Sequence, residues 1–190
     1  MHYYFTETIG KVLSSMFRLL LIAGLLAFLP SAFADTLSDG VEAYKAGRYD
    51  LAIKLLVPLA NESNSQAQFH VGMMHYHGHG IPENEKLAVY WLRKSAMQGH
   101  SGAMFELGNA YLLGHEASKL VPDPDREAAL WYFQAASAGH AEAQYHLGLL
   151  FLAGKGVIES RAEATSWFKK AATQGHVEAK RAIGRVASGK

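Results

Sequence analysis

Residues 142–156, EAQYHLGLLFLAGKG, and residues 163–176, EATSWFKKAATQGH, carry the pattern that decides the fold of this 190-residue chain. The first part of the pattern also occurs upstream, as QAQFHVGMMHYHGHG from Gln66 and as GAMFELGNAYLLGH from Gly102. A shortened version, EAKRAIGRVASGK, begins at Glu178. Self-similarity of this kind is the sequence signature of a repeat architecture, in which stacked units share a continuous core.

The units keep their register along the chain. Identical residues at equivalent positions, called anchors below, recur in the first segment at intervals of 36, 40 and 36 residues. The period is therefore 36 residues, with one insertion of four at about residues 117–124. So regular a period predicts that every unit folds in the same way. The anchors of the first segment are Ala67, Ala103, Ala143 and Ala179, with Gly72, Gly108, Gly148 and Gly184. Those of the second segment are Trp91, Trp131 and Trp167, with Gly99, Gly139 and Gly175.

Each unit is predicted to form two antiparallel helices. Apolar residues of the first segment have helical spacing, as at Ala67, Val71 and Met74. Gly72 and its equivalents lie in the middle of that helix, where glycine costs about 1 kcal/mol relative to alanine. A penalty that recurs in every unit implies a recurring benefit, which we expect to be close approach of the partner helix. With a further helix–turn–helix at residues 41–56, the sequence predicts an all-α fold of about nine helices without strands.

The pattern A-x-A-x-[YF]-x-L-G-x-x-[YF]-x-x-G-x-G-[VI], followed by A-x-x-W-x-x-x-A-A-x-x-G-H, resembles the Sel-one-like repeat family, which is related to the tetratricopeptide repeats. The third unit matches best. The second departs where Gly114 is followed by His115 and Glu116, and the last carries Arg181 at an aromatic position. The resemblance implies a right-handed α-solenoid of helical hairpins that acts as a protein-binding adaptor, often in the bacterial envelope.

We expect an exported scaffold without enzymatic activity, and the resemblance implies a role in envelope signalling, assembly or regulation. Some exported relatives resemble immunity proteins against secreted toxins, and others act in host interaction, so an immunity protein or a secreted effector is an alternative. A hydrolase of the β-lactam-binding type is a further alternative, suggested by distant cysteine-rich relatives. This chain has no cysteine and lies outside the pattern of that branch.

The predicted organisation follows the repeats. The segments are a signal peptide at 1–34, a tetratricopeptide-like hairpin at 35–65, three full repeats at 66–100, 101–140 and 141–176, and a truncated repeat with a capping helix at 177–190.

Composition limits the kinds of partner. With 18 Lys and Arg against 17 Asp and Glu, the chain carries no strong charge, which argues against nucleic acid or an anionic membrane surface. The absence of cysteine excludes disulfides, a thiolate zinc site and a cysteine nucleophile. We expect another protein as the partner, no cofactor, and a monomeric chain.

The N-terminus has the parts of a secretory signal peptide. Arg18 precedes an apolar run of 11 residues at 19–29, and Ala-Phe-Ala at 32–34 forms a cleavage motif. The run is too short for a membrane helix, which needs about 20 residues. We expect cleavage after Ala34, a mature chain without a membrane span, and a periplasmic or secreted location. Met16 is an alternative start, because the segment before Arg18 is unusually long.

The histidine patterns are interpreted as structural. His75, His77 and His79 alternate as in a metal site, but successive residues of a helix are rotated by about 100°, so alternate side chains point apart. No Ser/His/Asp set, phosphate loop or pair of acids stands out, and we predict no catalytic residue and no metal site. A histidine follows the last glycine of each full unit: His100, His140 and His176. A catalytic site is not built three times, so we expect these histidines to be junction residues, with a structural role where one unit ends and the next begins.

The positions where the repeats differ suggest a binding surface. One stripe of the first helices carries different residues in each unit, whereas fold-determining positions are retained. In solenoids the first helices usually line the concave side, where partners bind. An idle solvated face is the alternative interpretation. The residues predicted to bind a partner are His70, Met73, His77, Glu106, Asn109, His146 and Leu149.

Two further expectations concern this stripe. Equivalent positions of packed helices stand side by side, so His70, Glu106 and His146 are expected to form a row with a carboxylate between two imidazoles. A carboxylate favours imidazolium, so the row is expected to titrate between about pH 5 and 8. The second unit is unusually apolar on its outer face, which makes that face the alternative binding surface, near Tyr90, Leu130 and Phe133.

Overall fold

The computed structural model of the protein describes residues 36–188, and within that range it contains nine helices and no strand. The all-α prediction is therefore confirmed. The signal peptide predicted at 1–34, with its cleavage after Ala34, lies outside the described residues. A first helix occupies residues 36–45, and a short 3₁₀ turn, Ser118–Leu120, lies in the loop before α6. The other helices are α2 (Tyr49–Asn61), α3 (Ser65–His77), α4 (Glu85–Ala96), α5 (Ser101–Leu113), α6 (Pro124–Ser137), α7 (Ala141–Ala153), α8 (Arg161–Thr173) and α9 (Val177–Ala187).

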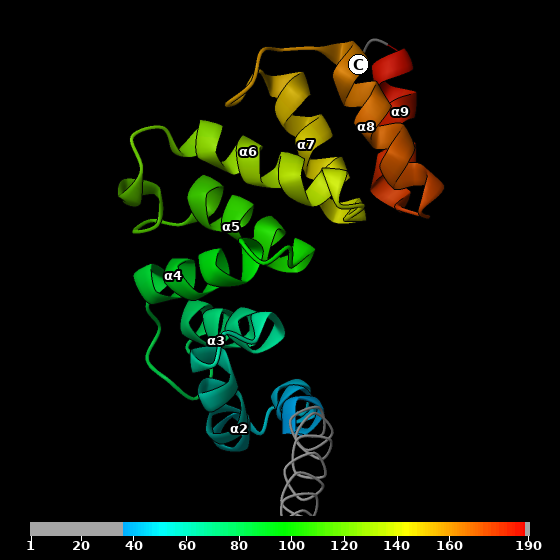
Figure 1. The fold of residues 1–190 in the computed structure, drawn as a ribbon. Helices are drawn as coiled ribbons and strands as arrows, with labels where there is room; N and C mark the ends of the chain where they lie inside the picture. Colours follow the sequence, from blue (N-terminus) through cyan, green and yellow to red (C-terminus); the bar gives the residue numbers. More distant parts are fainter. Residues whose placement is uncertain (1–35, 189–190) are drawn as a thin grey trace, which may run out of the picture.

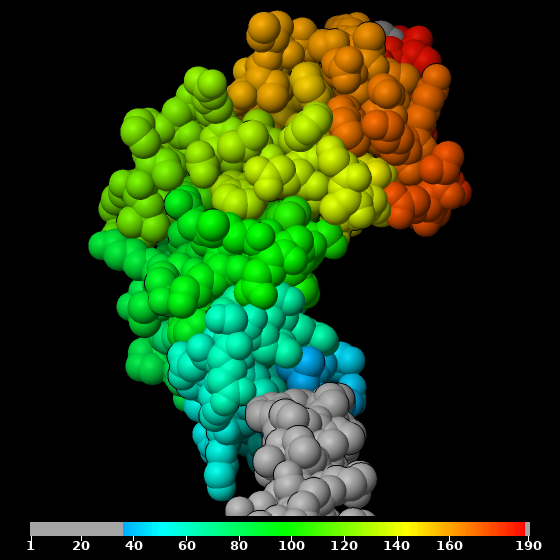
Figure 2. Space-filling model, viewed as in Figure 1, coloured from blue at the N-terminus to red at the C-terminus, as the bar shows by residue number. Residues whose placement is uncertain are grey.

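The helices are stacked in chain order along a curved array (Figure 1). From α2 on, each helix packs on its neighbours in the chain, most extensively within the pairs α3–α4, α5–α6 and α7–α8. Contacts between successive units only are the arrangement of a solenoid, so the predicted array of helical hairpins is confirmed. Figure 2 shows that the array is hollowed on one side, between its N-terminal end and α8.

A glycine in the middle of each full unit's first helix lets the second helix approach closely. A Cβ atom on Gly72 would lie 2.9 Å from Cγ of Leu92, and one on Gly148 would lie 2.5 Å from Cε1 of Phe168. These separations leave no room for a methyl group, and the predicted reason for the recurring glycine is confirmed. The third such pair is Gly108 and Tyr132.

The junction histidines cap the helices that follow them. Nδ1 of His100 accepts a hydrogen bond of 3.0 Å from the backbone N–H of Ala103. His140 and His176 accept the same bond, at 3.2 Å, from the N–H three residues ahead. An N-cap acceptor satisfies one of the backbone donors that the first helical turn leaves unpaired. The structural interpretation of these histidines is confirmed, and their role is to start α5, α7 and α9.

The same imidazoles join successive units. Each stacks on an aromatic ring in the first helix of the preceding unit, so one side chain caps a helix and packs across the unit boundary. The centroid separations are 4.6 Å for His100 on Phe69, 4.9 Å for His140 on Phe105 and 4.7 Å for His176 on Tyr145.

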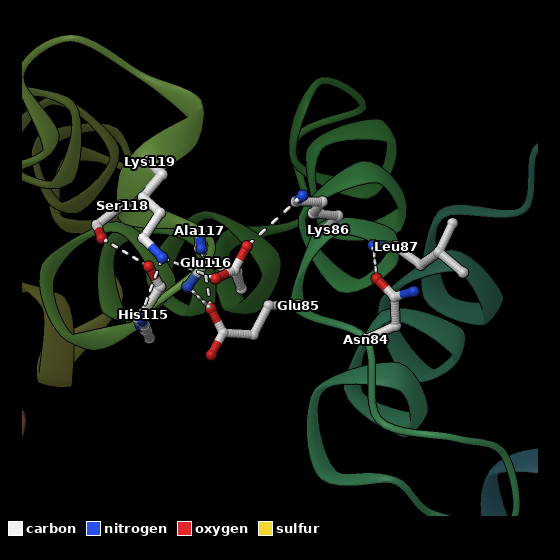
Figure 3. A network of polar contacts seen from close by, with 9 residues as sticks. All are labelled: Asn84, Glu85, Lys86, Leu87, His115, Glu116, Ala117, Ser118 and Lys119. Atoms are coloured by element: carbon white, nitrogen blue, oxygen red, sulfur yellow. Dashed lines mark hydrogen bonds and ion pairs between the residues drawn. The ribbon is translucent and has the colours of Figure 1, made fainter.

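The loop with the four extra residues is held by a carboxylate of the preceding unit (Figure 3). Oε2 of Glu85, in the first turn of α4, accepts hydrogen bonds from the N–H groups of Glu116 at 2.7 Å and Ala117 at 2.9 Å. Nζ of Lys86 lies 3.5 Å from Oε2 of Glu116, and the Ala117 side chain is buried. The insertion therefore follows a defined course, although its sequence departs from the repeat.

Candidate partner-binding surface

The predicted stripe lies on α3, α5 and α7, and its members differ in exposure. His77 is exposed, whereas only 9% of the surface of His70 is exposed. The ring of His70 packs against those of Tyr44 and Phe69, with 5.1 Å between centroids in each pair. His70 is therefore part of the packing between first helices, and its placement on an open surface is wrong. The half-buried members are Met73, Glu106, Asn109, His146 and Leu149.

Burial sets the charge of His70. Removal from water disfavours imidazolium and lowers the pKa of His70 to about 4, and the nearby His100 and Lys45 act in the same direction. Burial also lowers the pKa of His146, although Glu142 opposes this effect. His70 is thus largely neutral between about pH 5 and 8. The expectation that this row titrates between about pH 5 and 8 is therefore wrong for His70, because desolvation keeps its imidazole neutral in that range.

Glu106 belongs to a different polar chain. Nδ2 of Asn109 donates a hydrogen bond of 3.0 Å to Oε2 of Glu106, and the Tyr132 hydroxyl donates one of 2.6 Å to Oδ1 of Asn109. In the part of the chain that the structure describes, no Lys or Arg side chain pairs with Glu106. A half-buried carboxylate without a counter-ion attracts a cation from outside.

The charge of Glu106 affects tyrosines of three units. Its charge contributes to raising the pKa of Tyr44, Tyr76 and Tyr132, after burial, which is the largest cause for each. These tyrosines belong to the first helix, to α3 and to α6. The Glu106 carboxylate therefore acts electrostatically on side chains of three units.

The alternating histidines of α3 and its C-terminal turn have separate environments. Among the described residues, no group of three His, Asp or Glu side chains is arranged to hold a metal ion. The ring of His79 stacks on Tyr49 with 4.4 Å between centroids, and its Nδ1 lies 3.3 Å from the Tyr44 hydroxyl. The ring of His77 lies 5.1 Å from that of His79, and Nδ1 of His75 is buried on its own. Aromatic packing accounts for the positions of His77 and His79.

Two pairs of glutamines, which the sequence reasoning missed, connect the hairpins. Nε2 of Gln68 donates a hydrogen bond of 3.0 Å to the carbonyl of Ala60, and Nε2 of Gln98 donates one of 2.7 Å to Oε1 of Gln68. In the first and third units the two glutamines occur together, 30 residues apart, and this joint occurrence could have revealed the hydrogen bond between them. The second such pair, at 2.8 Å, is Gln174 and Gln144. The middle unit lacks both glutamines and has Met104 and Ala138.

The alternative surface on the outer face exposes apolar side chains. Their exposed fractions are 49% for Tyr90, 50% for Leu130 and 49% for Phe133. The structure therefore offers two surfaces for a partner, one on the first helices and one on the second helices.

The match to known families agrees with this geometry. The family model described as the Sel1 repeat matches residues 65–100, 101–140 and 141–176. The chain belongs to the Sel1 repeat family. Sel1 repeats generally form scaffolds for protein interaction. In the described part of this Sel1 repeat protein, no helix is long and apolar enough to cross a membrane.

Solved structures include similar Sel1 arrays. A Sel1 repeat protein from Oxalobacter formigenes is 35% identical with a TM-score of 0.70, and the match covers 76% of this chain and 58% of that one. A protective antigen of uropathogenic Escherichia coli strains, which displays an SLR fold, is 32% identical with a TM-score of 0.64, over 70% of this chain and 27% of that one. The chain therefore spans less than two thirds of either protein.

A more distant structure shares the fold alone. Cysteine-rich protein B of Helicobacter pylori is 23% identical with a TM-score of 0.53, and the match covers 70% of this chain and 92% of that one. No curated protein matches the chain.

Proposed function

We propose that this protein is an exported scaffold that binds another protein on the inner face of its first helices and has no enzymatic activity. Membership in the Sel1 repeat family supports a role in protein interaction. The observation that carries the choice of face is Glu106, a half-buried carboxylate without a cationic partner among the described residues. Met73 and Leu149 lie on the same stripe and offer half-exposed apolar surface.

The chemistry around Glu106 favours a basic side chain of the partner. A Lys or Arg placed there gains an ion pair with Glu106, which has no cationic partner among the described residues. Asn109 fixes the orientation of the carboxylate through its 3.0 Å hydrogen bond. His70 contributes by packing the first helices together.

Binding is tested with the tagged full chain, envelope extract and quantitative mass spectrometry of captured proteins. Glu106→Gln removes the charge while an acceptor oxygen for Asn109 remains, and Met73→Ala removes apolar surface. We expect each to weaken capture of the same protein about tenfold, since a factor of ten corresponds to about 1.4 kcal/mol. Glu159→Gln is the matched control, because Glu159 is exposed in the loop before α8. Equal capture by Glu106→Gln and this control would refute binding at the inner face.

Export is tested by determining the N-terminus of the protein recovered from the periplasm and the medium. We expect a mature chain that begins at Asp35, because cleavage is predicted after Ala34. Recovery of the full-length chain in the inner membrane would contradict the proposal.

The absence of enzymatic activity is tested with the purified full chain and a chromogenic β-lactam. We expect no turnover, because the described part of the chain holds no arrangement of side chains typical of a hydrolase. Turnover that a single substitution abolishes would show the protein to be an enzyme.

A further inference from the structure

One face of α9 lacks the helix that covers the equivalent face in every full unit. α9 packs mainly on α8, through Ile183 and Val186 (Figure 1). Another side, called the open face below, is exposed at Val177, Lys180 and Gly184, and no helix covers it within the described range 36–188. In the three full units, the same side of the first helix receives the second helix of that unit. α9 therefore presents one half of a hairpin interface.

Gly184 lies where each full unit brings a large side chain against a glycine. A Cβ atom on Gly184 would have no atom within 4 Å. Glycine weakens the interior of a helix relative to alanine, and among the described residues no close contact at Gly184 offsets that loss. The open face thus has a slot of the shape that a bulky side chain of a second helix fills. The contacting pairs in the full units are Gly72 with Leu92, Gly108 with Tyr132 and Gly148 with Phe168.

The open face carries two basic side chains and no acidic one. By helical spacing, residues 177, 180, 181, 184, 187 and 188 share this side of α9, and all of them are exposed. Nη1 of Arg181 lies 3.9 Å from Oε1 of Glu178, which is on the flank of the helix. In the part of the chain that the structure describes, no carboxylate pairs with Lys180. A molecule that covers this face gains most from an acidic group beside Lys180.

The full units also show which residue of a second helix lies opposite Lys180. In the first and third units this position is a glutamine, whose Oε1 accepts a hydrogen bond from a second glutamine. That second glutamine stands six residues after the bulky side chain that meets the mid-helix glycine. A lysine in place of the acceptor requires an acceptor on the other helix, and a carboxylate supplies it with the opposite charge. The glutamine pairs are Gln68 with Gln98 and Gln144 with Gln174.

We propose that the open face of α9 binds a helix of a partner protein, which places a bulky apolar side chain over Gly184 and an acidic residue beside Lys180. The contacts within the full units identify the occupant as a helix, and the charge of the face identifies the acid. The site is on α9, so it is separate from Glu106 on α5 and goes beyond the binding proposed for the inner face. A scaffold with both sites can hold two partners at once.

The test uses a displayed library of peptides based on residues 157–175 of this chain, which include α8. The two library positions that correspond to Phe168 and Gln174 are randomised, and the library is selected on the full chain. We expect Phe, Tyr or Leu to be enriched at the first position and Asp or Glu at the second. Calorimetry then measures the affinity of the selected peptides.

Two variants of the protein locate the binding. Gly184→Ala fills the slot, and the fold tolerates it because the added methyl group meets no atom within 4 Å. Lys180→Glu reverses the charge of an exposed side chain. We expect each variant to weaken binding of the selected peptides at least about tenfold, with unchanged circular dichroism. Lys169→Glu is the matched control, because it makes the same change of charge at an exposed position of α8.

Enrichment of a bulky apolar residue and an acid, with affinity lost in Gly184→Ala and Lys180→Glu but kept in Lys169→Glu, would support the proposal. No enrichment at either position, or equal affinity for all variants, would overturn it. Dimerisation in analytical ultracentrifugation that Gly184→Ala abolishes would also overturn it, because the face would then belong to a second copy of the chain. Binding at the inner face is measured separately with Glu106→Gln, so the failure of either proposal leaves the other open to its own test.

Discussion

The imidazole of His140 stacks on the ring of Phe105, with 4.9 Å between the centroids and 19° between the planes. The same imidazole caps α7 through its Nδ1. The stacking contact crosses the boundary between two units, and the hydrogen bond caps the first turn of α7. A histidine at this position therefore fixes the distance between units as well as the start of each new unit.

The two roles of His140 can be separated by substitution. His140→Asn keeps a capping acceptor, as Asn64 shows at the start of α3, but loses the stacking on Phe105. His140→Ala loses both. We expect the free energy of unfolding to fall by about 1 kcal/mol in the Asn variant and by about 2 kcal/mol in the Ala variant. Urea unfolding measures both, and equal losses would show that the cap contributes nothing.

The stability of the protein is expected to fall in mild acid. Burial lowers the pKa of His70 to about 4 and also lowers the pKa of His100 and His140. An unfolded chain has histidines with a pKa of about 6.5, so below that pH it binds more protons than the folded chain does. The stabilisation is therefore complete above about pH 6.5 and is lost as the pH falls towards 4.

Urea unfolding at about pH 7.5 and about pH 4.5 measures this loss. His70→Phe removes one titrating group and keeps a ring against Tyr44 and Phe69. Each unit of pKa shift corresponds to about 1.4 kcal/mol, so we expect this variant to lose clearly less stability between the two pH values. An identical loss in the variant and the original chain would rule out His70 as a source of acid sensitivity.

Two glycines at the same position of the repeat are expected to respond oppositely to alanine. A Cβ atom on Gly148 would lie 2.5 Å from Cε1 of Phe168, whereas one on Gly184 would have no atom within 4 Å. Gly148→Ala should lower the free energy of unfolding by about 1–3 kcal/mol through overpacking. Gly184→Ala should raise it by up to about 1 kcal/mol, because alanine favours the helix. Thermal unfolding followed by circular dichroism compares them, and destabilisation by both would contradict the packing argument.

The glutamine pair is expected to behave as a unit. Gln68→Met alone removes one hydrogen bond from the carbonyl of Ala60 and one from the amide of Gln98, and should cost about 1–2 kcal/mol. Adding Gln98→Ala reproduces the apolar pair of the middle unit and should cost less than the sum of the single changes. Urea unfolding of the single and double variants gives the coupling energy. Additive losses would mean that the two side chains act independently.

The sequence predicted the roles of residues that recur in every unit, but not the roles of residues whose contacts lie in a neighbouring unit. The glycines were predicted to permit close helix approach and the junction histidines to be structural, because each occurs at one position of every full unit. The capping bond of His100 was not predicted, since histidine is an uncommon cap and its ring could have faced elsewhere. His70 was misplaced, because its buried contact is with Tyr44 of a hairpin that lies outside the regular repeats.

The sequence by itself determined the period, the pairing of helices and the reason for the mid-helix glycines, since spacing, capping and close packing are local properties that each unit repeats. Tertiary structure decided which residues of the inner stripe are open and where the insertion loop runs. It also decided that Phe133, Phe151 and the loop residue Val121 line one groove. The physical reason is that burial and charge at these positions depend on contacts between different residues of successive units. The curvature of the array sets those contacts, so the sequence of a single unit does not contain them.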